Sequence, residues 1–209
     1  VFADTILQYA AQHAKEILET VHGSRQYMIR SGGVYDENRQ MVLEHKKVET
    51  GCWATPLIHV PTGQVADPDH SAPYTEHVAA LRSRPRATAY VLPKGLANET
   101  EIFRVLGIHA AAFYPLPAGS TVKLKQYVQQ GEETILTPEQ TVTFAQGGYV
   151  LPNTVPSTVL SVVMEPDFNR ESGRKMTLLS MGLIEPDADG ALPVYRYCHD
   201  LTDGKIAVE

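Results

Sequence analysis

The stretch that decides the fold is Ala-Thr-Ala-Tyr-Val-Leu-Pro at residues 87–93. An apolar run that stops at a proline is typical of a strand that ends there. Residues 98–101, Asn-Glu-Thr-Glu, resemble a capping box, in which Asn98 accepts from a free N–H group of the first helical turn and Glu101 reaches back. A helix and a second apolar run at residues 110–116 follow. This order predicts a β-α-β unit with a right-handed crossover.

The same phrase returns as Gly-Tyr-Val-Leu-Pro at residues 148–152. A second capping stretch follows at residues 153–157, where Pro156 suits a first helical turn, and Glu165–Pro166 ends the helix beyond it. Two such units predict two neighbouring strands of one sheet, each leading into a helix at the same sheet edge. The alternative is chance recurrence of a four-residue word.

The other half of the sheet is expected from the remaining apolar runs. The pattern predicts antiparallel strands at residues 121–128, 134–137 and 140–144. A strand at residues 195–197 either completes the sheet or frays. The expected class is therefore α/β: a mixed sheet with two strand-proline-helix units, flanked by helices, plus an antiparallel β-rich insertion.

The N-terminal part is expected to begin with one packed helix. Apolar residues spaced by three and four over residues 2–21 predict a stripe that faces a core, with Gly23 as the helix stop. Residues 24–209 are then the α/β domain. For residues 24–86 we expect strand pieces at 42–48 and 52–60 with turns at Gly51 and 61–63, a polar loop at 67–73 and a short helix at 74–82.

Composition narrows the class of protein. The chain has 209 residues, of which 43% are apolar and 20% charged, so it has enough apolar surface to fold. Its net charge of −6 argues against binding to the phosphate backbone of a nucleic acid. No apolar run reaches the roughly 18 residues that a membrane-spanning helix needs. Because the chain opens at Val1 with a helical pattern, we expect a fragment of a longer protein.

Three arginines are the candidate anion-binding residues. Arg82, Arg84 and Arg86 interleave with Pro85 just before the first strand, and guanidinium groups in such a run can clamp an anion. The alternative is a solvated strand entrance. No His-Glu-x-x-His or His-x-His motif is present, and the best local metal cluster, at residues 67–70, is typical of a solvent-facing loop.

The two cysteines leave several possibilities open. Cys52 and Cys198 either form one long-range disulfide or remain as two buried thiols. Cys52 with His59 is a weak candidate for a thiol hydrolase. Cys198 precedes His199 and Asp200, but neighbours on a strand point to opposite faces, which is poor geometry for a catalytic triad.

Several of these phrases resemble one family. The line from Gly148 to Pro152, the helix after it and Met164-Glu165-Pro166 are similar to the C-terminal region of large bacterial zinc carboxypeptidases of the carboxypeptidase A-like metallopeptidase family. Those proteins have Leu-Glu-Pro where this chain has Met164-Glu165-Pro166. Residues 6–17 resemble the helix that closes their peptidase domain. The resemblance covers about residues 1–22 and 87–184, and its motifs consist of structural residues.

The resemblance implies a role without catalytic residues in this chain. The family binds zinc through a His-x-x-Glu pair and a later histidine and uses a glutamate as general base. The resemblance places all of these groups upstream of Val1, so it assigns none of them to a residue of this chain. We therefore expect this chain to be a non-catalytic accessory domain. Its partner would be an upstream peptidase domain, which would hold the zinc and bind the peptide substrate. The whole protein would be extracytoplasmic or secreted. The alternative is a free-standing module that binds a small ligand or anion beyond Pro93 and Pro152, where helix N-termini can receive an anion.

Overall fold

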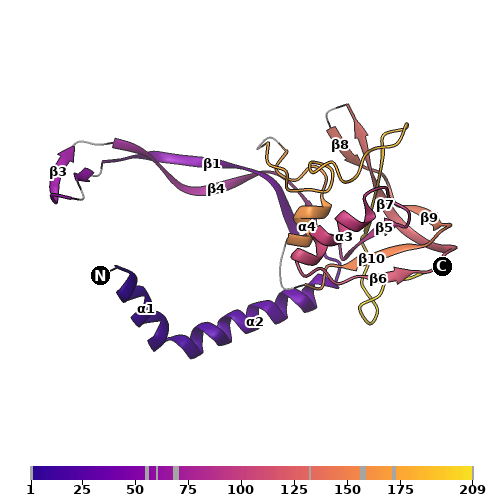
Figure 1. Cartoon of the computed structure of the whole chain (residues 1–209), viewed down its shortest axis with the longest axis horizontal. Coiled ribbons are helices and arrows are strands. Elements are labelled where there is room, and N and C mark those ends of the chain that lie inside the picture. Colours follow the sequence, from indigo (N-terminus) through magenta and orange to yellow (C-terminus); the bar gives the residue numbers. More distant parts are fainter. Residues whose placement is uncertain are drawn as a thin grey trace. The chain divides into compact units, whose positions relative to one another are not determined.

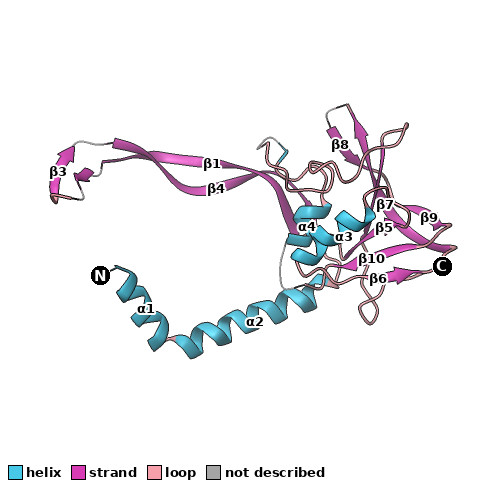
Figure 2. Cartoon of the chain, in the orientation of Figure 1, coloured by secondary structure: helices cyan, strands magenta, loops and turns pink. Residues whose placement is uncertain are grey.

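The computed structural model describes residues 2–54, 57–59, 61–67, 71–131, 133–155, 159–170 and 173–208. Their helices and antiparallel sheets confirm an α/β fold (Figure 2). The chain divides into two compact units. The larger unit combines Val1–Gln40 with Pro85–Glu209, and the smaller is Met41–Arg84.

A seven-stranded sheet forms the body of the larger unit (Figure 1). The strand order is β6-β10-β5-β11-β7-β8, and β9 also pairs with β7. All of these described pairings are antiparallel. The strands are β5 (Ala89–Pro93), β6 (Tyr114–Leu116), β7 (Ser120–Gln130), β8 (Glu133–Leu136), β9 (Gln140–Phe144), β10 (Gly148–Pro152) and β11 (Ala191–Tyr197).

Both faces of the sheet are buried, because successive side chains of a strand alternate between them. On one face, Tyr90 and Leu92 of β5 pack with Ile102 of α3 (Glu99–Ile108) and Leu160 of α4 (Val159–Met164). On the other face, Ala89 and Val91 pack with apolar residues of β6, β7, β9 and β10. The expected strands in this half and the helix that ends before Glu165 are confirmed, whereas Pro156 lies outside the described residues.

The two repeated phrases are neighbours, but they run in opposite directions. In the antiparallel register of β5 and β10, Gly148 pairs with Pro93 and Pro152 with Ala89. The expectation of helices at the same sheet edge is therefore wrong. Because β10 is antiparallel to both β5 and β6, those two strands are parallel to each other and α3 connects them around β10. The tetrapeptide sets where a strand ends, and long-range pairing sets its direction.

The smaller unit consists of two pairs of strands. Strands β1 (Gln40–Ala54) and β4 (Ser71–Pro85) form a two-stranded sheet, and β2 (Leu57–His59) pairs with β3 (Gln64–Asp67) around the expected turn at residues 61–63. The expectation of a turn at Gly51 is wrong, because β1 continues through this residue. The helix at residues 74–82 is wrong, as is the loop over Ser71 to Pro73, because β4 occupies both stretches.

Two helices begin the chain: α1 (Phe2–Gln12) and α2 (Ala14–Gly32). The helix stop at Gly23 is wrong, since α2 continues to Gly32 and the break falls at His13 instead. The expectation that this apolar stripe faces a core is also wrong, because its large residues are exposed: Ile6, Tyr9, Ile17, Leu18 and Val21. None of the described helices is both long and apolar enough to cross a bilayer.

Candidate functional site

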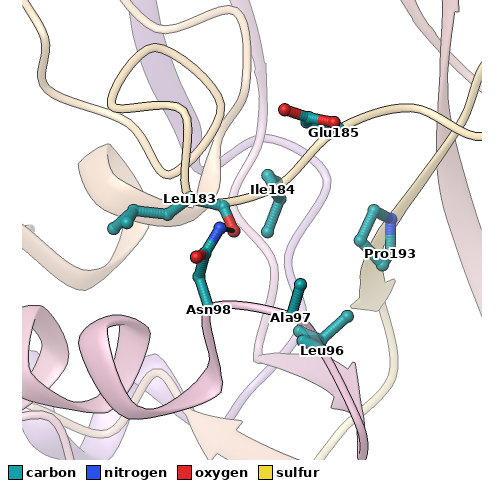
Figure 3. A pocket seen from close by; sticks show the side chains of 7 residues that line it. All are labelled: Leu96, Ala97, Asn98, Leu183, Ile184, Glu185 and Pro193. Atoms are coloured by element: carbon teal, nitrogen blue, oxygen red, sulfur yellow. Dashed lines mark hydrogen bonds between the residues drawn. The ribbon is translucent and has the colours of Figure 1, made fainter.

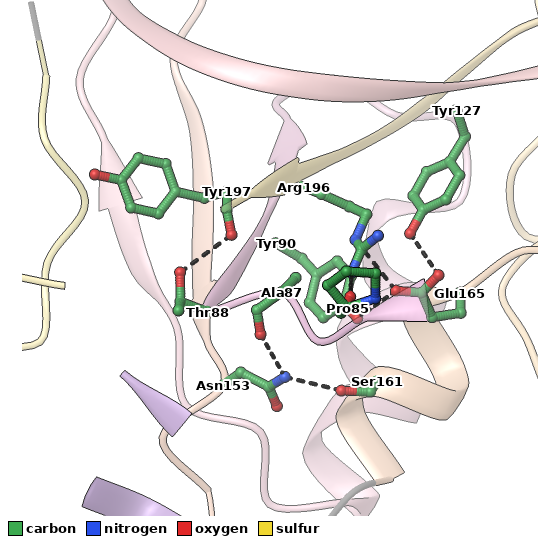
Figure 4. A network of polar contacts seen from close by, with 10 residues as sticks. All are labelled: Pro85, Ala87, Thr88, Tyr90, Tyr127, Asn153, Ser161, Glu165, Arg196 and Tyr197. Atoms are coloured by element: carbon green, nitrogen blue, oxygen red, sulfur yellow. Dashed lines mark hydrogen bonds and ion pairs between the residues drawn. The ribbon is translucent and has the colours of Figure 1, made fainter. Parts of the chain in front are cut away.

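Four buried side chains form a polar cluster inside the larger unit (Figure 4). Glu165 accepts the hydroxyl groups of Tyr90 at 2.8 Å and of Tyr127 at 2.7 Å, one on each carboxylate oxygen. The Nε of Arg196 lies 3.3 Å from Oε1 of Glu165, and Nη2 of Arg196 donates to the carbonyl of Pro85. Arg196 and Glu165 are 2% and 0% exposed, so solvent does not screen this ion pair.

Three neighbouring strands and one helix end position the cluster. Tyr90 lies on β5, Arg196 on β11 and Tyr127 on β7, and the register places Arg196 directly opposite Tyr90. All three side chains share the sheet face against which α4 packs. Glu165 follows the last residue of α4, so its carboxylate ties that helix to three strands.

The electrostatics of the cluster favour a neutral Tyr90 and a charged Arg196. Burial, and secondly the charge of Glu165, raises the pKa of Tyr90 well above its ordinary value. Burial works against the charge of Arg196, but interactions with Tyr127, Glu165 and Tyr90 outweigh it, so the pKa of Arg196 is raised. The cluster is a hydrogen-bonded internal ion pair, and its role is to fix the packing of α4 on the sheet.

Because the folded protein keeps Tyr90 neutral, its free energy of unfolding is expected to fall in alkali. Unfolded Tyr90 ionises near its ordinary pKa of 10.0, whereas the folded protein holds the proton more tightly. The stabilising contribution is therefore complete below about pH 10 and is lost as the pH rises toward the folded pKa. Urea unfolding at about pH 8 and pH 10.5 measures it.

Tyr90→Phe is the variant that tests this assignment. It is expected to lower the free energy of unfolding by about 1–3 kcal/mol at neutral pH, because Glu165 loses a hydrogen-bond donor. It is also expected to reduce the fall of that free energy with pH above about pH 10. Some pH dependence of the free energy of unfolding remains in this variant, since burial also raises the pKa of Tyr114 and of Tyr195. An unchanged slope in Tyr90→Phe would contradict the prediction.

The three predicted arginines are divided between the two units, Arg82 and Arg84 in the smaller and Arg86 in the larger. Arg82 lies on β4 with its Nε 3.6 Å from a carboxylate oxygen of Glu44, and Arg84 is two residues further along the same strand. Arg86 belongs to the larger unit and donates to the carbonyl and side-chain oxygens of Asn153, at 3.2 and 3.0 Å. Asn153 in turn donates to the carbonyl of Ala87 and the hydroxyl of Ser161 (Figure 4). Arg86 is therefore part of a structural network.

A pocket of about 260 Å³ lies beyond Pro93, at the start of α3 (Figure 3). Its lining is mostly apolar: Leu96, Ala97, Asn98, Leu183, Ile184, Glu185 and Pro193. The capping box expected here is wrong, because Asn98 instead donates to the carbonyl of Leu183 at 3.1 Å and Glu101 pairs with Arg104.

The carboxylates around this helix start are unfavourable for an anion. Glu99 accepts the N–H group of Gly95 at 2.9 Å and the hydroxyl of Tyr149 at 2.7 Å, and these bonds lower its pKa. The negative charges of Glu99 and Glu101 offset the positive end of the helix dipole. Pro152 lies at the other end of the β5–β10 pair, so the two helix starts do not form one anion site.

The remaining candidates from the sequence give no reactive cluster among the described residues. No group of three or more metal-ligating side chains is found there, and Asp69, His70 and the side chain of Cys52 lie outside the described parts. Cys198 is a free, buried thiol whose pKa is raised, chiefly by burial. His199 binds Glu139 and Asp200 accepts from the backbone of Tyr35, so the two have separate partners.

Comparisons with protein-family models, curated proteins and solved structures find no match for this chain.

Sequence reasoning missed the central cluster, although a signal was present. Leu192, Val194 and Arg196 occupy alternate positions of β11, and the first two are fully buried. A charged residue in register with buried apolar residues must be buried as well, and a buried charge requires a partner.

Proposed function

We propose that this chain is a non-catalytic accessory domain of a zinc metallocarboxypeptidase-like protein that hydrolyses peptide or cell-wall-type amide bonds. The chain would pack against the peptidase domain that holds the zinc, and would support that domain or shape access to it. Its own groups would contribute to folding and docking. The proposal begins from the resemblance in residues 1–22 and 87–184.

The observation that carries the proposal is the apolar surface of α1 and α2. Ile6, Leu7 and Tyr9 of α1 are 52%, 67% and 61% exposed, and Leu18 of α2 is 68% exposed. Apolar residues at helical spacing favour burial against another surface, which the described residues do not supply. These residues belong to the segment that resembles the last helix of a peptidase domain, so that domain is the partner we propose.

The roles of the motif residues support the same proposal. Tyr90 of the first repeated phrase donates to Glu165 of Met164-Glu165-Pro166, and the second phrase is β10, the neighbour of β5. The phrases within residues 87–184 that carry the resemblance thus pack into one sheet and its polar cluster. A shared core architecture, rather than a shared active site, is what an accessory domain would retain.

Binding to a peptidase domain tests the proposal. We expect the chain to bind a separately expressed zinc carboxypeptidase catalytic domain of that family in calorimetry. Leu18→Lys is expected to weaken binding at least about tenfold, because it places a charge in the apolar surface. Gln8→Lys on α1 is the matched control, since it adds the same charge at an exposed polar position and is expected to leave the affinity within about twofold.

Zinc and activity measurements on the chain alone complete the test. We expect neither stoichiometric zinc binding at sub-micromolar concentration nor turnover of peptides with a free C-terminus. Zinc binding of that strength, or turnover, would show a catalytic chain and overturn the proposal. Failure of every family peptidase domain to bind, or equal binding by the two lysine variants, would remove the docking role.

A further inference from the structure

The pocket beyond Pro93 has apolar residues on opposite sides (Figure 3). Leu96 and Ala97 come from the loop between β5 and α3, Ile184 comes from the segment before β11, and Pro193 lies on β11. Ile184 is only 4% exposed and belongs to the apolar core, so the pocket reaches that core. Its volume of about 260 Å³ lies just below the roughly 300–1,000 Å³ of ordinary ligand sites, which suits a small molecule with an apolar part.

A hydrogen bond joins the two segments that line this pocket. The side-chain amide of Asn98 donates to the carbonyl of Leu183 at 3.1 Å, and Asn98 makes no side-chain cap for α3. The bond fixes the spacing of the two segments before any ligand arrives. A site that is ordered in advance loses less entropy when a ligand binds.

One side of the pocket carries negative charge. Glu185 lies across the pocket from Leu96 (Figure 3). The residue is exposed, and no described residue makes a hydrogen bond or an ion pair with its carboxylate. Its segment, residues 183–190, also contains Asp187 and Asp189 and has no lysine, arginine or histidine. An exposed carboxylate without a partner can turn toward a cation in the pocket.

The basic residues that flank the α3 side in sequence have other partners. The Nζ atom of Lys94 lies 5.7 Å from the centre of the Tyr149 ring, and the guanidinium group of Arg104 binds Glu101. The acids on the opposite side therefore keep their negative field, which attracts cations and repels anions. This is the reverse of the anion site expected beyond Pro93 from the sequence.

We propose that this pocket binds a small aliphatic amine, a molecule in which an ammonium group is attached to a short alkyl chain. Such an amine is protonated at neutral pH, as a lysine side chain is. Its ammonium group pairs with the carboxylate of Glu185. Its alkyl chain displaces water from the apolar side chains of Leu96, Ala97 and Ile184, which lie on the sides of the pocket away from that carboxylate.

The combination of the two contacts gives the pocket its selectivity. An exposed ion pair alone contributes little, and so does the burial of one short alkyl chain. A neutral molecule of the same shape lacks the ion pair, and a carboxylate of the same shape is repelled by Glu185. The expected order of affinity is therefore amine, then alcohol, then carboxylate.

The site is independent of the accessory role. It uses no residue of α1 or α2, and its ligand is a small molecule rather than a peptidase domain. Loss of docking with amine binding intact would remove the accessory role alone. Loss of amine binding with docking intact would remove this site alone.

Titration of the whole chain with 3-methylbutylammonium chloride at neutral pH, followed by methyl NMR, tests the proposal. The signal to follow is the δ1 methyl group of Ile184, because this residue lines the pocket and is nearly buried. We expect a saturable shift with a Kd on the order of millimolar, as befits so small a ligand. At equal ionic strength, 3-methyl-1-butanol is expected to bind about threefold more weakly and 3-methylbutanoate at least about tenfold more weakly.

Two charge reversals separate this site from a general charge effect. Glu185→Lys is expected to weaken amine binding at least about tenfold and to reverse the preference, so that 3-methylbutanoate binds more tightly than the amine. Glu37→Lys is the matched control, since Glu37 is an exposed acid of the larger unit that does not line the pocket. It is expected to retain the preference for the amine and to change its affinity less than about twofold.

A third variant tests the position of the alkyl chain. Ala97 is exposed and lines the pocket, so Ala97→Trp fills the pocket without entering the core. We expect it to abolish the saturable shift with both the amine and the alcohol, at a melting temperature that shows a folded protein. Amine binding that survives in this variant would place the ligand elsewhere and overturn the proposal.

Three results with the other samples would also overturn it. The first is the absence of a saturable amine shift in the unmodified chain. The second is binding of the alcohol or of the carboxylate that equals or exceeds that of the amine. The third is an equal loss of amine affinity in the Glu185 and Glu37 variants, which would show attraction by net charge rather than by this pocket.

Discussion

Arg196→Met is expected to lower the free energy of unfolding by about 3–5 kcal/mol, because it leaves the buried Glu165 carboxylate without its positive partner. Tyr90 and Tyr127 continue to donate hydrogen bonds to Glu165, but neither carries a positive charge. Methionine retains much of the side-chain volume, so the loss reports on the charge rather than on a cavity. Urea unfolding, followed by circular dichroism, measures the change.

The matched control for this variant is Arg104→Met. Arg104 makes a two-point contact with Glu101, at 2.6 and 2.7 Å, but both residues are exposed. Solvent screening weakens such exposed pairs, so only a small change in the free energy of unfolding is expected. Equal losses in the two arginine variants would contradict the assignment of the buried ion pair.

A double variant separates the cost of an unpaired charge from the value of the pair. Replacing both Glu165 and Arg196 by methionine removes the two charges together. We expect it to be more stable than Arg196→Met alone, because no buried charge is left unpaired. A double variant that is less stable than the single one would show that the hydrogen bonds of Glu165 to the tyrosines dominate.

Gly32→Ala is expected to separate the end of α2 from the core. A Cβ atom at this position would lie 2.0 Å from the carbonyl oxygen of Asn153 and 2.8 Å from its carbonyl carbon. Both neighbours are backbone atoms of a network that also holds Arg86, so they cannot move aside cheaply. We expect a loss of about 1–3 kcal/mol and faster proteolysis within α2.

The same substitution earlier in the helix has the opposite expected sign. Gly23 has no atom within 4 Å of an added Cβ, and it lies in the interior of α2. Alanine is favoured over glycine in a helix by about 1 kcal/mol, so Gly23→Ala is expected to raise the helical content in circular dichroism. If Gly32→Ala were as stable as Gly23→Ala, the close approach at Asn153 would be refuted.

Local sequence patterns were sufficient wherever a short segment sets its own structure. Apolar runs located β5 and β7 to β10, and the proline-terminated phrases marked the ends of two of these strands. The same local reasoning failed for residues 74–82, whose apolar spacing is helical but whose backbone pairs with β1. It failed again at Gly23, because one glycine weakens a helix without ending it.

The sequence by itself determined most strands of the seven-stranded sheet and the mixed α/β class. Tertiary structure alone decided that β10 runs against β5, that β11 lies between β5 and β7, and that Glu165 meets Arg196. Strand order and direction depend on contacts between residues far apart in the chain, as does the pairing of buried charges. Local periodicity reports which face of an element is apolar, and it carries no information about which distant partner will cover that face.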